Sequence, residues 1–329
     1  MTPLHFVPSP KLRIALTGAF GAPESSLPWM DRFLEPEELV LVQALAAGPL
    51  TPPAAARAIA DAAGRHVSPS FFERCERRAI IDRPTPDVIV LADFGSRLDV
   101  WCMFEGWKDL PAEAREALAD WRLARYIDDK RPQVESLLAG EAPLPGIENA
   151  EYLLLPEAET IVDRAAHVYL WPCDCRALFG RCDKPSAVCL RFDNDRGLGW
   201  EISRERAVDV LRRADAAGLM HTGEVAPLDS VGPEPIDRGA ICNCCGDCCF
   251  PHLAGEALGA VRVWPRARYV ARRDPDTCNR CRTCVKRCPF GAFSRDGADV
   301  VFDGSRCRGC GLCATGCKEQ AIAMEPLAG

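Results

Sequence analysis

Apolar positions recur with a helical period in three short segments of the N-terminal third. The first segment, 36–48, reads PEELVLVQALAAG and ends in a glycine, and the second, 51–63, opens with a Thr-Pro pair that supplies a cap and a first turn. A third helix is expected from Ser68 or Ser70 through the stretch FFERCERRAII. The β-branched residues 87–91 then predict one arm of a short hairpin.

Three short helices followed by a two-stranded ribbon is the element order of a winged-helix domain, so we expect such a domain here. DNA binding is the less favoured function for it. Glu73 and Glu76 alternate with Arg74, Arg77 and Arg78 in the third helix, and residues 31–140 carry 14 Lys and Arg against 19 Asp and Glu. Because neutralised phosphates supply most non-specific DNA affinity, this balance favours docking of a protein.

The remaining pattern predicts an α+β chain of several domains. Residues 1–30 are rich in proline and predict an ordered arm with one short strand at 12–16, while 111–140 predict a charged helix. A connector with Pro and Gly follows. The expected domains are an arm at 1–30, a helical, winged-helix-like domain at 31–145, a central cysteine-rich domain at 146–265, and a C-terminal domain at 266–329.

Composition sets the broad class. The chain has 329 residues, 48% of them apolar and 26% charged, with a net charge of −7, as expected of an ordered globular protein. The negative charge argues against general affinity for nucleic acid or an anionic membrane. Since no run of eighteen apolar residues and no signal-peptide layout occurs, we expect a cytoplasmic protein.

Cysteine content carries more information than any other feature. There are 19 cysteines, an odd number, and all but Cys75 and Cys102 lie between Cys173 and Cys317. A reducing cytoplasm keeps thiols free, so clustered cysteines are better explained as metal or cluster ligands than as disulfides. Cys75 and Cys102 have apolar and aromatic neighbours and are expected to be buried structural thiols.

Eight cysteines near the C-terminus form two runs with equal spacing. The first run is Cys278-x2-Cys281-x2-Cys284-x3-Cys288, and the second, 18 residues later, is Cys307-x2-Cys310-x2-Cys313-x3-Cys317. Gaps of two residues turn three thiolates toward one centre, as a cubane needs. Two four-cysteine zinc sites are the alternative, but zinc modules rarely use three cysteines in one such run.

This region, about 270–325, resembles the bacterial two-cluster ferredoxins. In that family the fourth cysteine of each run binds the other cluster. The resemblance therefore implies two low-potential [4Fe–4S] clusters, one held by Cys278, Cys281, Cys284 and Cys317 and the other by Cys307, Cys310, Cys313 and Cys288. The sequence departs from the family pattern at Lys318, where a second proline would often follow the last cysteine of the run. Nearby cations should raise the potentials somewhat; they are Lys286, Arg287, Arg306 and Arg308.

Nine further cysteines precede the ferredoxin-like region: Cys173, Cys175, Cys182, Cys189, Cys242, Cys244, Cys245, Cys248 and Cys249. The first four suffice for one all-cysteine site, a cubane or a zinc ion. The last five include adjacent pairs, whose side chains point apart, so we expect them to be divided between two centres. A further iron–sulfur centre is favoured, with a structural zinc site or a redox-active thiol group as alternatives.

Other polar residues near these cysteines are weaker candidates. His252 could be a ligand or proton donor, although a lone histidine is more often structural. Arg176, Arg181 and Arg191 could offset the negative charge of a cluster.

The favoured function is electron transfer. Electrons would enter the two C-terminal clusters, pass to a central centre and leave to a partner enzyme docked on the N-terminal domain. One alternative is an iron–sulfur reductase that acts on an unknown substrate at the central centre, and another is a redox-sensing regulator that uses the winged-helix-like domain. No G-x-G-x-x-G or Walker loop occurs, so the electrons are expected to come from another protein.

Overall fold

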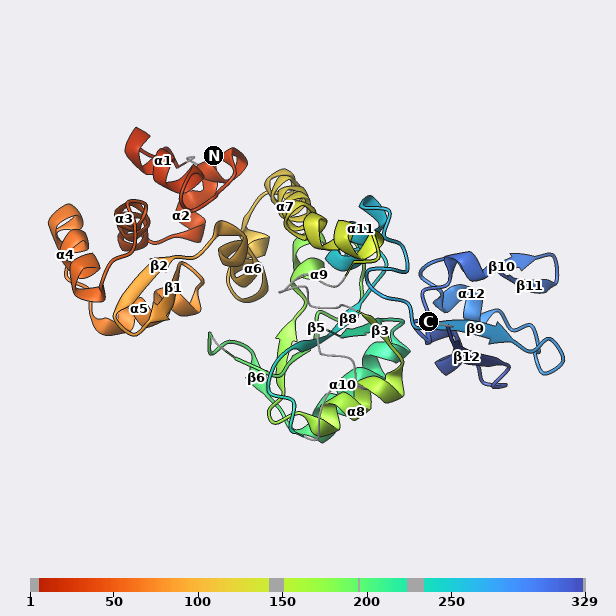
Figure 1. Ribbon diagram of the computed structural model, residues 1–329. Helices are drawn as coiled ribbons and strands as arrows, with labels where there is room; N and C mark the ends of the chain where they lie inside the picture. Colours follow the sequence, from red (N-terminus) through yellow and green to blue (C-terminus); the bar gives the residue numbers. More distant parts are fainter. Residues whose placement is uncertain (1–5, 142–150, 195, 224–233, 328–329) are drawn as a thin grey trace. The chain divides into compact units, whose positions relative to one another are not determined.

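The computed structural model describes residues 6–141, 151–194, 196–223 and 234–327 (Figure 1). The chain divides into two compact units. The first contains the residues up to Arg122 together with the short segments Ala177–Phe179 and Asp195–Leu198, and the second contains the rest. The mixture of helices and sheets confirms the α+β class. The predicted domain boundaries stay predictions.

The first unit begins with helices where a strand was expected. Helix α1 spans Pro10–Thr17, so the strand predicted at 12–16 is wrong. The Ser9 side chain accepts a hydrogen bond from the Leu12 backbone N–H, and Pro10 fixes the first turn, so this cap starts a helix that includes residues 12–16. A 3-10 turn η1 (Glu24–Trp29) and helix α2 (Met30–Phe33) follow.

Three helices and a hairpin then appear in the expected order. They are α3 (Pro36–Leu45), α4 (Pro52–Ala63), α5 (Pro69–Arg77), β1 (Ile81–Thr85) and β2 (Val88–Leu91). β1 and β2 pair antiparallel, and a bridge joins Leu50 to Ile89. No solved structure matches the chain, so the name winged helix stays a prediction.

An aromatic core closes the first unit. Helix α6 (Phe94–Phe104) and the 3-10 turn η2 (Trp107–Asp109) precede the long helix α7 (Ala112–Leu138), which continues into the second unit. The Trp101 ring lies 4.5 Å from that of Phe33 and 6.0 Å from that of Trp107, centroid to centroid. Both tryptophans are buried.

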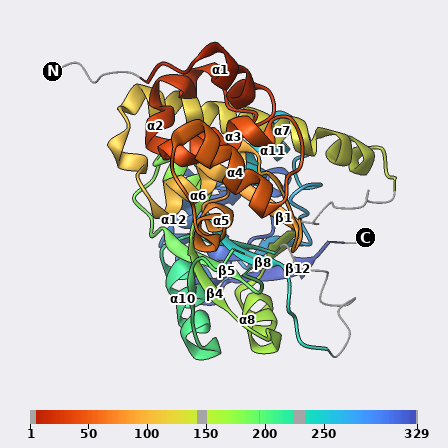
Figure 2. The same ribbon diagram turned by 90° about the vertical axis from the view of Figure 1, so that its left-hand side faces the viewer.

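A six-stranded antiparallel sheet is the framework of the second unit. Its strands lie in the order β3 (Glu151–Leu153), β7 (Met220–Gly223), β8 (Ala240–Cys244), β5 (Ala187–Arg191), β4 (Tyr169–Pro172) and β6 (Trp200–Glu201). Helices α8 (Leu155–Arg164) and α10 (Arg204–Ala216) lie side by side against it in both views (Figures 1 and 2). The short helix α9 (Asp174–Phe179) follows β4 and has Cys173 at its N-cap, and α11 (Phe250–Ala257) follows β8, which carries Cys242 and Cys244.

The C-terminal part is built as two similar halves. Strand β9 (Tyr269–Arg273) pairs with β12 (Ile322–Pro326), and β10 (Phe293–Asp296) pairs with β11 (Asp299–Phe302). Each half carries one short helix, α12 (Thr283–Arg287) or α13 (Leu312–Thr315), and a 3-10 turn η4 (Gly304–Arg306) precedes the second cysteine run.

Arg287 fastens this part to the rest of the second unit. Its Nη2 donates to a carboxylate oxygen of Asp215 at 2.9 Å, and its Nε donates to the carbonyl of Leu312 at 2.7 Å. The Thr315 hydroxyl donates to the other Asp215 oxygen, also at 2.9 Å. Because Asp215 is buried near the C-terminal end of α10, these bonds hold both cysteine-bearing helices against the sheet domain.

Candidate functional site

The two C-terminal cysteine runs share one backbone conformation. In the first run Arg280 and Arg282, on either side of Cys281, have φ of 62° and 64°. In the second run the corresponding Gly309 and Gly311 have φ of 73° and 78°. Left-handed residues on both sides of the middle cysteine curl each loop around a single point, which lets three thiols face the same centre. Glycine adopts this conformation freely, whereas arginine adopts it at a cost.

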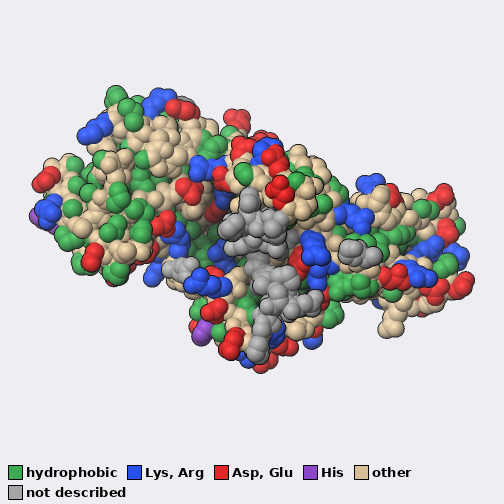
Figure 3. All heavy atoms as spheres, viewed as in Figure 1, with side chains coloured by type: hydrophobic (Ala, Val, Ile, Leu, Met, Phe, Trp, Pro, Cys, Tyr) green, Lys and Arg blue, Asp and Glu red, His purple; other side chains and the backbone are tan. Residues whose placement is uncertain are grey.

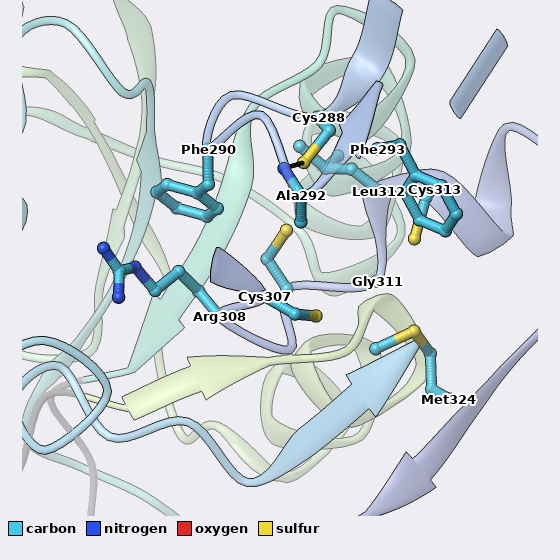
Figure 4. Close-up of a pocket in the computed structure, with 11 residues that line it drawn as sticks. Cys288, Phe290, Ala292, Phe293, Cys307, Arg308, Gly311, Leu312, Cys313 and Met324 are labelled. Carbon is cyan, nitrogen blue, oxygen red and sulfur yellow. Dashed lines mark hydrogen bonds between the residues drawn. The ribbon is translucent and has the colours of Figure 1, made fainter. Parts of the chain in front are cut away.

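The eight thiols gather around two separate cavities. One cavity is lined by Cys278, Cys281, Cys284 and Cys317, and the other by Cys288, Cys307, Cys310 and Cys313. Each cavity therefore takes three cysteines from one run and the last cysteine from the other run, the grouping that the ferredoxin resemblance implies. Figure 4 shows the sulfur atoms of Cys288, Cys307 and Cys313 turned toward one space. Four thiols around each cavity match the four cysteine ligands of a cubane cluster.

The two cavities differ in exposure. Cys281 is exposed, and hydrogen bonds centred on Thr283 lower the pKa of its thiol. Around the second cavity Cys307 and Cys313 are buried, and burial raises the pKa of Cys310 to about 12. We call the two sets of ligands the outer set (with Cys281) and the inner set (with Cys310). Exposure and hydrogen bonds to sulfur both tune cluster potentials, so the two centres should be inequivalent.

The nine central cysteines fall into two groups. Six of them form a continuous chain of sulfur contacts, here called the six-thiol chain: Cys175, Cys173, Cys189, Cys242, Cys244 and Cys249. The remaining three, here called the three-thiol group, are Cys182, Cys245 and Cys248, whose sulfurs all lie within 4.8 Å of one another. The sulfurs of Cys182 and Cys245 are 3.6 Å apart.

This division follows the alternation of adjacent cysteines. Cys244 ends strand β8 and joins the six-thiol chain, while Cys245 turns to the other group; Cys248 and Cys249 separate in the same way. The last five cysteines are thus shared between two groups; that they serve two centres stays a prediction. Cys182 departs from the first four, since it lies with Cys245, 63 residues further along the chain.

Polar contacts hold the six-thiol chain in place. The Phe250 backbone N–H donates to the sulfur of Cys175, and the hydroxyl of Thr222 lies 3.4 Å from the sulfur of Cys244. Asn243, between two of the cysteines, binds His221 Nδ1 and donates to the carbonyl of Val188, both at 2.5 Å. Burial lowers the pKa of His221, so its imidazole is neutral.

Arg176 is a buried cation beside both thiol groups. Its side chain donates to the carbonyls of Pro185 (2.5 Å) and Asn243 (2.8 Å), and its Nε has no partner among the described residues. Burial alone would lower the pKa of Arg176, but the nearby thiols, Cys173 and Cys245 first among them, raise it. A guanidinium buried here favours negative charge on the surrounding sulfurs.

An apolar contact joins the six-thiol chain to the inner set. Tyr152 and Phe290 form one buried cluster with Cys244 and Cys249, and Cys288 and Cys310 of the inner set pack against the same cluster. The Tyr152 and Phe290 rings meet edge to face with centroids 5.9 Å apart. Burial raises the pKa of Tyr152, and the thiols of Cys249 and Cys310 raise it further, so the phenol is neutral.

The other candidates have structural surroundings. His252 is buried, its ring centroid is 5.0 Å from that of Phe290, and burial lowers its pKa. Cys75 and Cys102 are buried in the first unit, as predicted. Burial raises the pKa of Cys75 far above its usual range, so it is an unreactive thiol.

The predicted cluster cations are mostly engaged in packing. Arg306 donates to the carbonyl of Phe290 at 3.1 Å, and the Arg308 guanidinium lies 5.4 Å from the centre of the Phe290 ring, next to it in Figure 4. Arg191 stacks on Trp171. Figure 3 shows basic and acidic side chains interspersed on the visible face of each unit, without a continuous basic patch there.

Several contributors were not visible in the sequence. Tyr152 lies 92 residues before Cys244 and 136 before Cys288, which belong to its buried cluster, and Phe290 carries no polar group that would single it out. Asn243 gave a weak signal through its place between Cys242 and Cys244. Among the described helices none has the length and apolar character needed to cross a bilayer.

Comparison with known proteins identifies the C-terminal part. Residues 271–318 match the family model of the 4Fe–4S dicluster domain. An uncharacterized ferredoxin of Methanocaldococcus jannaschii is 31% identical over 87 residues, 26% of this chain and 50% of that protein. The pyruvate synthase subunit PorD of Methanothermobacter marburgensis is 38% identical over 52 residues, 16% of this chain and 60% of that subunit.

A further relative is a subunit of a dehydrogenase. The beta subunit of the NADH-dependent phenylglyoxylate dehydrogenase of Aromatoleum evansii is 31% identical over 101 residues, 27% of this chain and 23% of the subunit. The chain thus spans between about a quarter and three fifths of the length of these relatives. The predicted dicluster ferredoxin domain is confirmed, and iron–sulfur electron transfer is the general function it supports.

Proposed function

We propose, on the premise that residues 271–318 are a 4Fe–4S dicluster domain, that this protein carries electrons from a donor protein through two cubanes to a third centre on the six-thiol chain, and from there to a partner enzyme. The outer set would hold the first cluster, the inner set the second, and the crossed fourth ligands would keep the two close together.

The direction of this path follows from exposure. A donor protein needs an accessible cluster, and the outer set contains the exposed Cys281. The inner set is more enclosed and adjoins the apolar cluster around Tyr152 and Phe290. Electrons that enter at the surface would therefore move inward, away from water, toward the six-thiol chain.

The observation that carries the proposal is the shared packing of Cys244 and Cys249 with Cys288 and Cys310 around two aromatic rings. A dry, close-packed contact between two sets of thiols suits electron transfer between the centres that they would hold. Six thiols are more than the four ligands that a cubane needs. Thiols that touch one another would separate on cluster binding, because each thiolate of a cubane binds a different iron.

A larger enzyme is the proposed partner. Two of the relatives are named as subunits of pyruvate synthase and of phenylglyoxylate dehydrogenase, which are multi-subunit oxidoreductases. We assign the docking of an acceptor enzyme to the helical domain at 31–145, whose acidic balance disfavours nucleic acid.

Reductive titration of the anaerobic full-length protein tests the third centre. With a strong chemical reductant we expect about three electrons per chain, one for each cluster. The double variant Cys244→Ser, Cys249→Ser should take up about two, with both ferredoxin clusters retained in EPR spectra. Cys102→Ser, which replaces a buried thiol in the first unit and keeps a donor for the Asp99 carbonyl, is the control.

Uptake of about two electrons by the unaltered protein would refute the proposed third redox centre. If the titration shows a third centre whose EPR signal changes on addition of small ligands, the centre is a catalytic site, and the protein is a reductase.

A further inference from the structure

The three-thiol group is separate from the six-thiol chain and has a different geometry. We propose that Cys182, Cys245 and Cys248 bind one zinc ion, independently of any cluster on the six-thiol chain. The inference does not depend on the electron path proposed above, since none of these three residues takes part in it.

Sulfur spacing distinguishes a single ion from a cubane. Thiolates on one zinc ion lie about 2.3 Å from the metal and hence, at tetrahedral angles, about 3.8 Å from one another. In a cubane each thiolate binds a different iron, so the sulfurs lie farther apart. The 3.6 Å between Cys182 and Cys245, and the 4.8 Å limit that includes Cys248, fit the single ion.

The same structure contains a comparison for this spacing. The eight ferredoxin cysteines surround two cavities. Among the described residues, none of these eight belongs to a set of three ligand atoms that all lie within 4.8 Å of one another. The ligand atoms of Cys173, Asp174 and Cys175 also lie within 4.8 Å of one another, but these three residues are neighbours in sequence. Cys182 instead has to be brought to Cys245 by the fold.

Arg176 connects the two segments that carry the ligands. One guanidinium nitrogen donates to the carbonyl of Pro185, three residues after Cys182, and another donates to the carbonyl of Asn243, two residues before Cys245. This bridge fixes the distance between the segments whether or not a metal is bound. Arg176 is therefore a positioning residue for the site.

Charge balance agrees with the same occupant. Three thiolates around Zn²⁺ carry a net charge of −1, and the buried guanidinium supplies +1. Buried charges are tolerated when they are paired in this way. Arg176 is buried beside Cys245 and Cys182 of this group and also beside Cys173 of the six-thiol chain, so its charge favours thiolates in both groups.

The site has an open fourth position. The group contains three ligand atoms among the described residues, so the fourth position falls to water or to one exogenous ligand. Cys245 and Cys248 are buried while Cys182 is partly exposed, so the group reaches solvent through Cys182. Zinc sites with three protein ligands and an exchangeable fourth are typical of catalytic rather than structural zinc.

The test measures zinc and iron in anaerobically purified full-length protein. We expect about one zinc per chain, and loss of at least nine tenths of it in Cys182→Ser and in Cys248→Ser, with the iron content and the reduced ferredoxin EPR signals unchanged. Cys102→Ser is the matched control and should keep both metals. Exchange with Co²⁺ in the unaltered protein should give the thiolate charge-transfer and d–d bands of tetrahedral cobalt, which needs no variant to fold.

Three results would overturn the proposal. One is an absence of zinc and of a tetrahedral cobalt spectrum. Another is a loss of about four irons in Cys182→Ser, which would make the group part of a cubane. The third is a disulfide between Cys182 and Cys245 or Cys248, detected by mass spectrometry after alkylation, which would make the group a redox-active thiol site.

Discussion

The left-handed arginine at position 280 gives a prediction that separates backbone strain from side-chain contacts. Arg280 has φ of 62°, while the corresponding residue of the second run is Gly309. The left-handed conformation of a residue other than glycine destabilises the folded state by about 1–2 kcal/mol. Glycine avoids this strain, but its greater freedom in the unfolded chain lowers the stability by about 0.5–1 kcal/mol. Arg280→Gly should therefore be about 0.5–1 kcal/mol more stable than Arg280→Ala.

Arg280→Ala is the appropriate reference because both variants lose the exposed ion pair with Asp299. In this pair Arg280 Nε lies 3.4 Å from a carboxylate oxygen of Asp299. The assay is the rate at which the iron–sulfur absorbance bleaches in guanidinium under anaerobic conditions. If the difference acts on the barrier to cluster loss, Arg280→Gly should bleach about 2- to 5-fold more slowly than Arg280→Ala.

Replacement of Gly309, the corresponding residue of the second run, should be much more destabilising. A Cβ added at Gly309 would lie 2.3 Å from the carbonyl oxygen of Tyr269, and φ is 73°. Strain and overlap together predict a loss of about 2–5 kcal/mol in Gly309→Ala, and bleaching at least about tenfold faster. Equal bleaching rates for the glycine and alanine variants at 280, or a harmless Gly309→Ala, would refute the assignment of strain to these loops.

Three further outcomes are expected. Cys288→Ala should remove about four irons and leave the exposed cluster, whereas Cys317→Ala should leave the enclosed one; iron analysis with EPR checks both, and the opposite assignment would contradict the crossed ligands. Asp215→Asn weakens the bonds to Arg287 and Thr315 by about 1–3 kcal/mol, so α13 amides should exchange hydrogen about 5- to 150-fold faster; unchanged exchange would show that this contact is not needed. Arg176→Met should weaken zinc binding about 10- to 100-fold in chelator competition, and an unaltered affinity would remove Arg176 from the site.

The sequence predicted those features that depend on local spacing. The two cysteine runs identified the dicluster domain, because two-residue gaps and a distant fourth ligand are requirements of the cluster itself. The helices at 36–45 and 52–63 were predicted because their caps and apolar period agree. At residues 12–16 the same kind of local pattern was misleading, since the cap at Ser9 decided the conformation.

Features that depend on long-range contacts could not be predicted. The alternation of Cys244 and Cys245 indicated two groups of thiols. It did not indicate that Cys182 contacts Cys245 and is separate from Cys173, Cys175 and Cys189. The position of Cys245 relative to Cys182 depends on the pairing of β8 with β5 and β7. No local sequence pattern indicates this pairing. The aromatic contact of Tyr152 with Phe290 is likewise a product of tertiary packing.

The central claim is that a third iron–sulfur centre adjoins the ferredoxin pair. Iron and acid-labile sulfide per chain, measured on anaerobically purified full-length protein, test it most directly. About twelve irons and twelve sulfides per chain are predicted, whereas about eight of each would contradict a central cubane and leave the ferredoxin clusters alone.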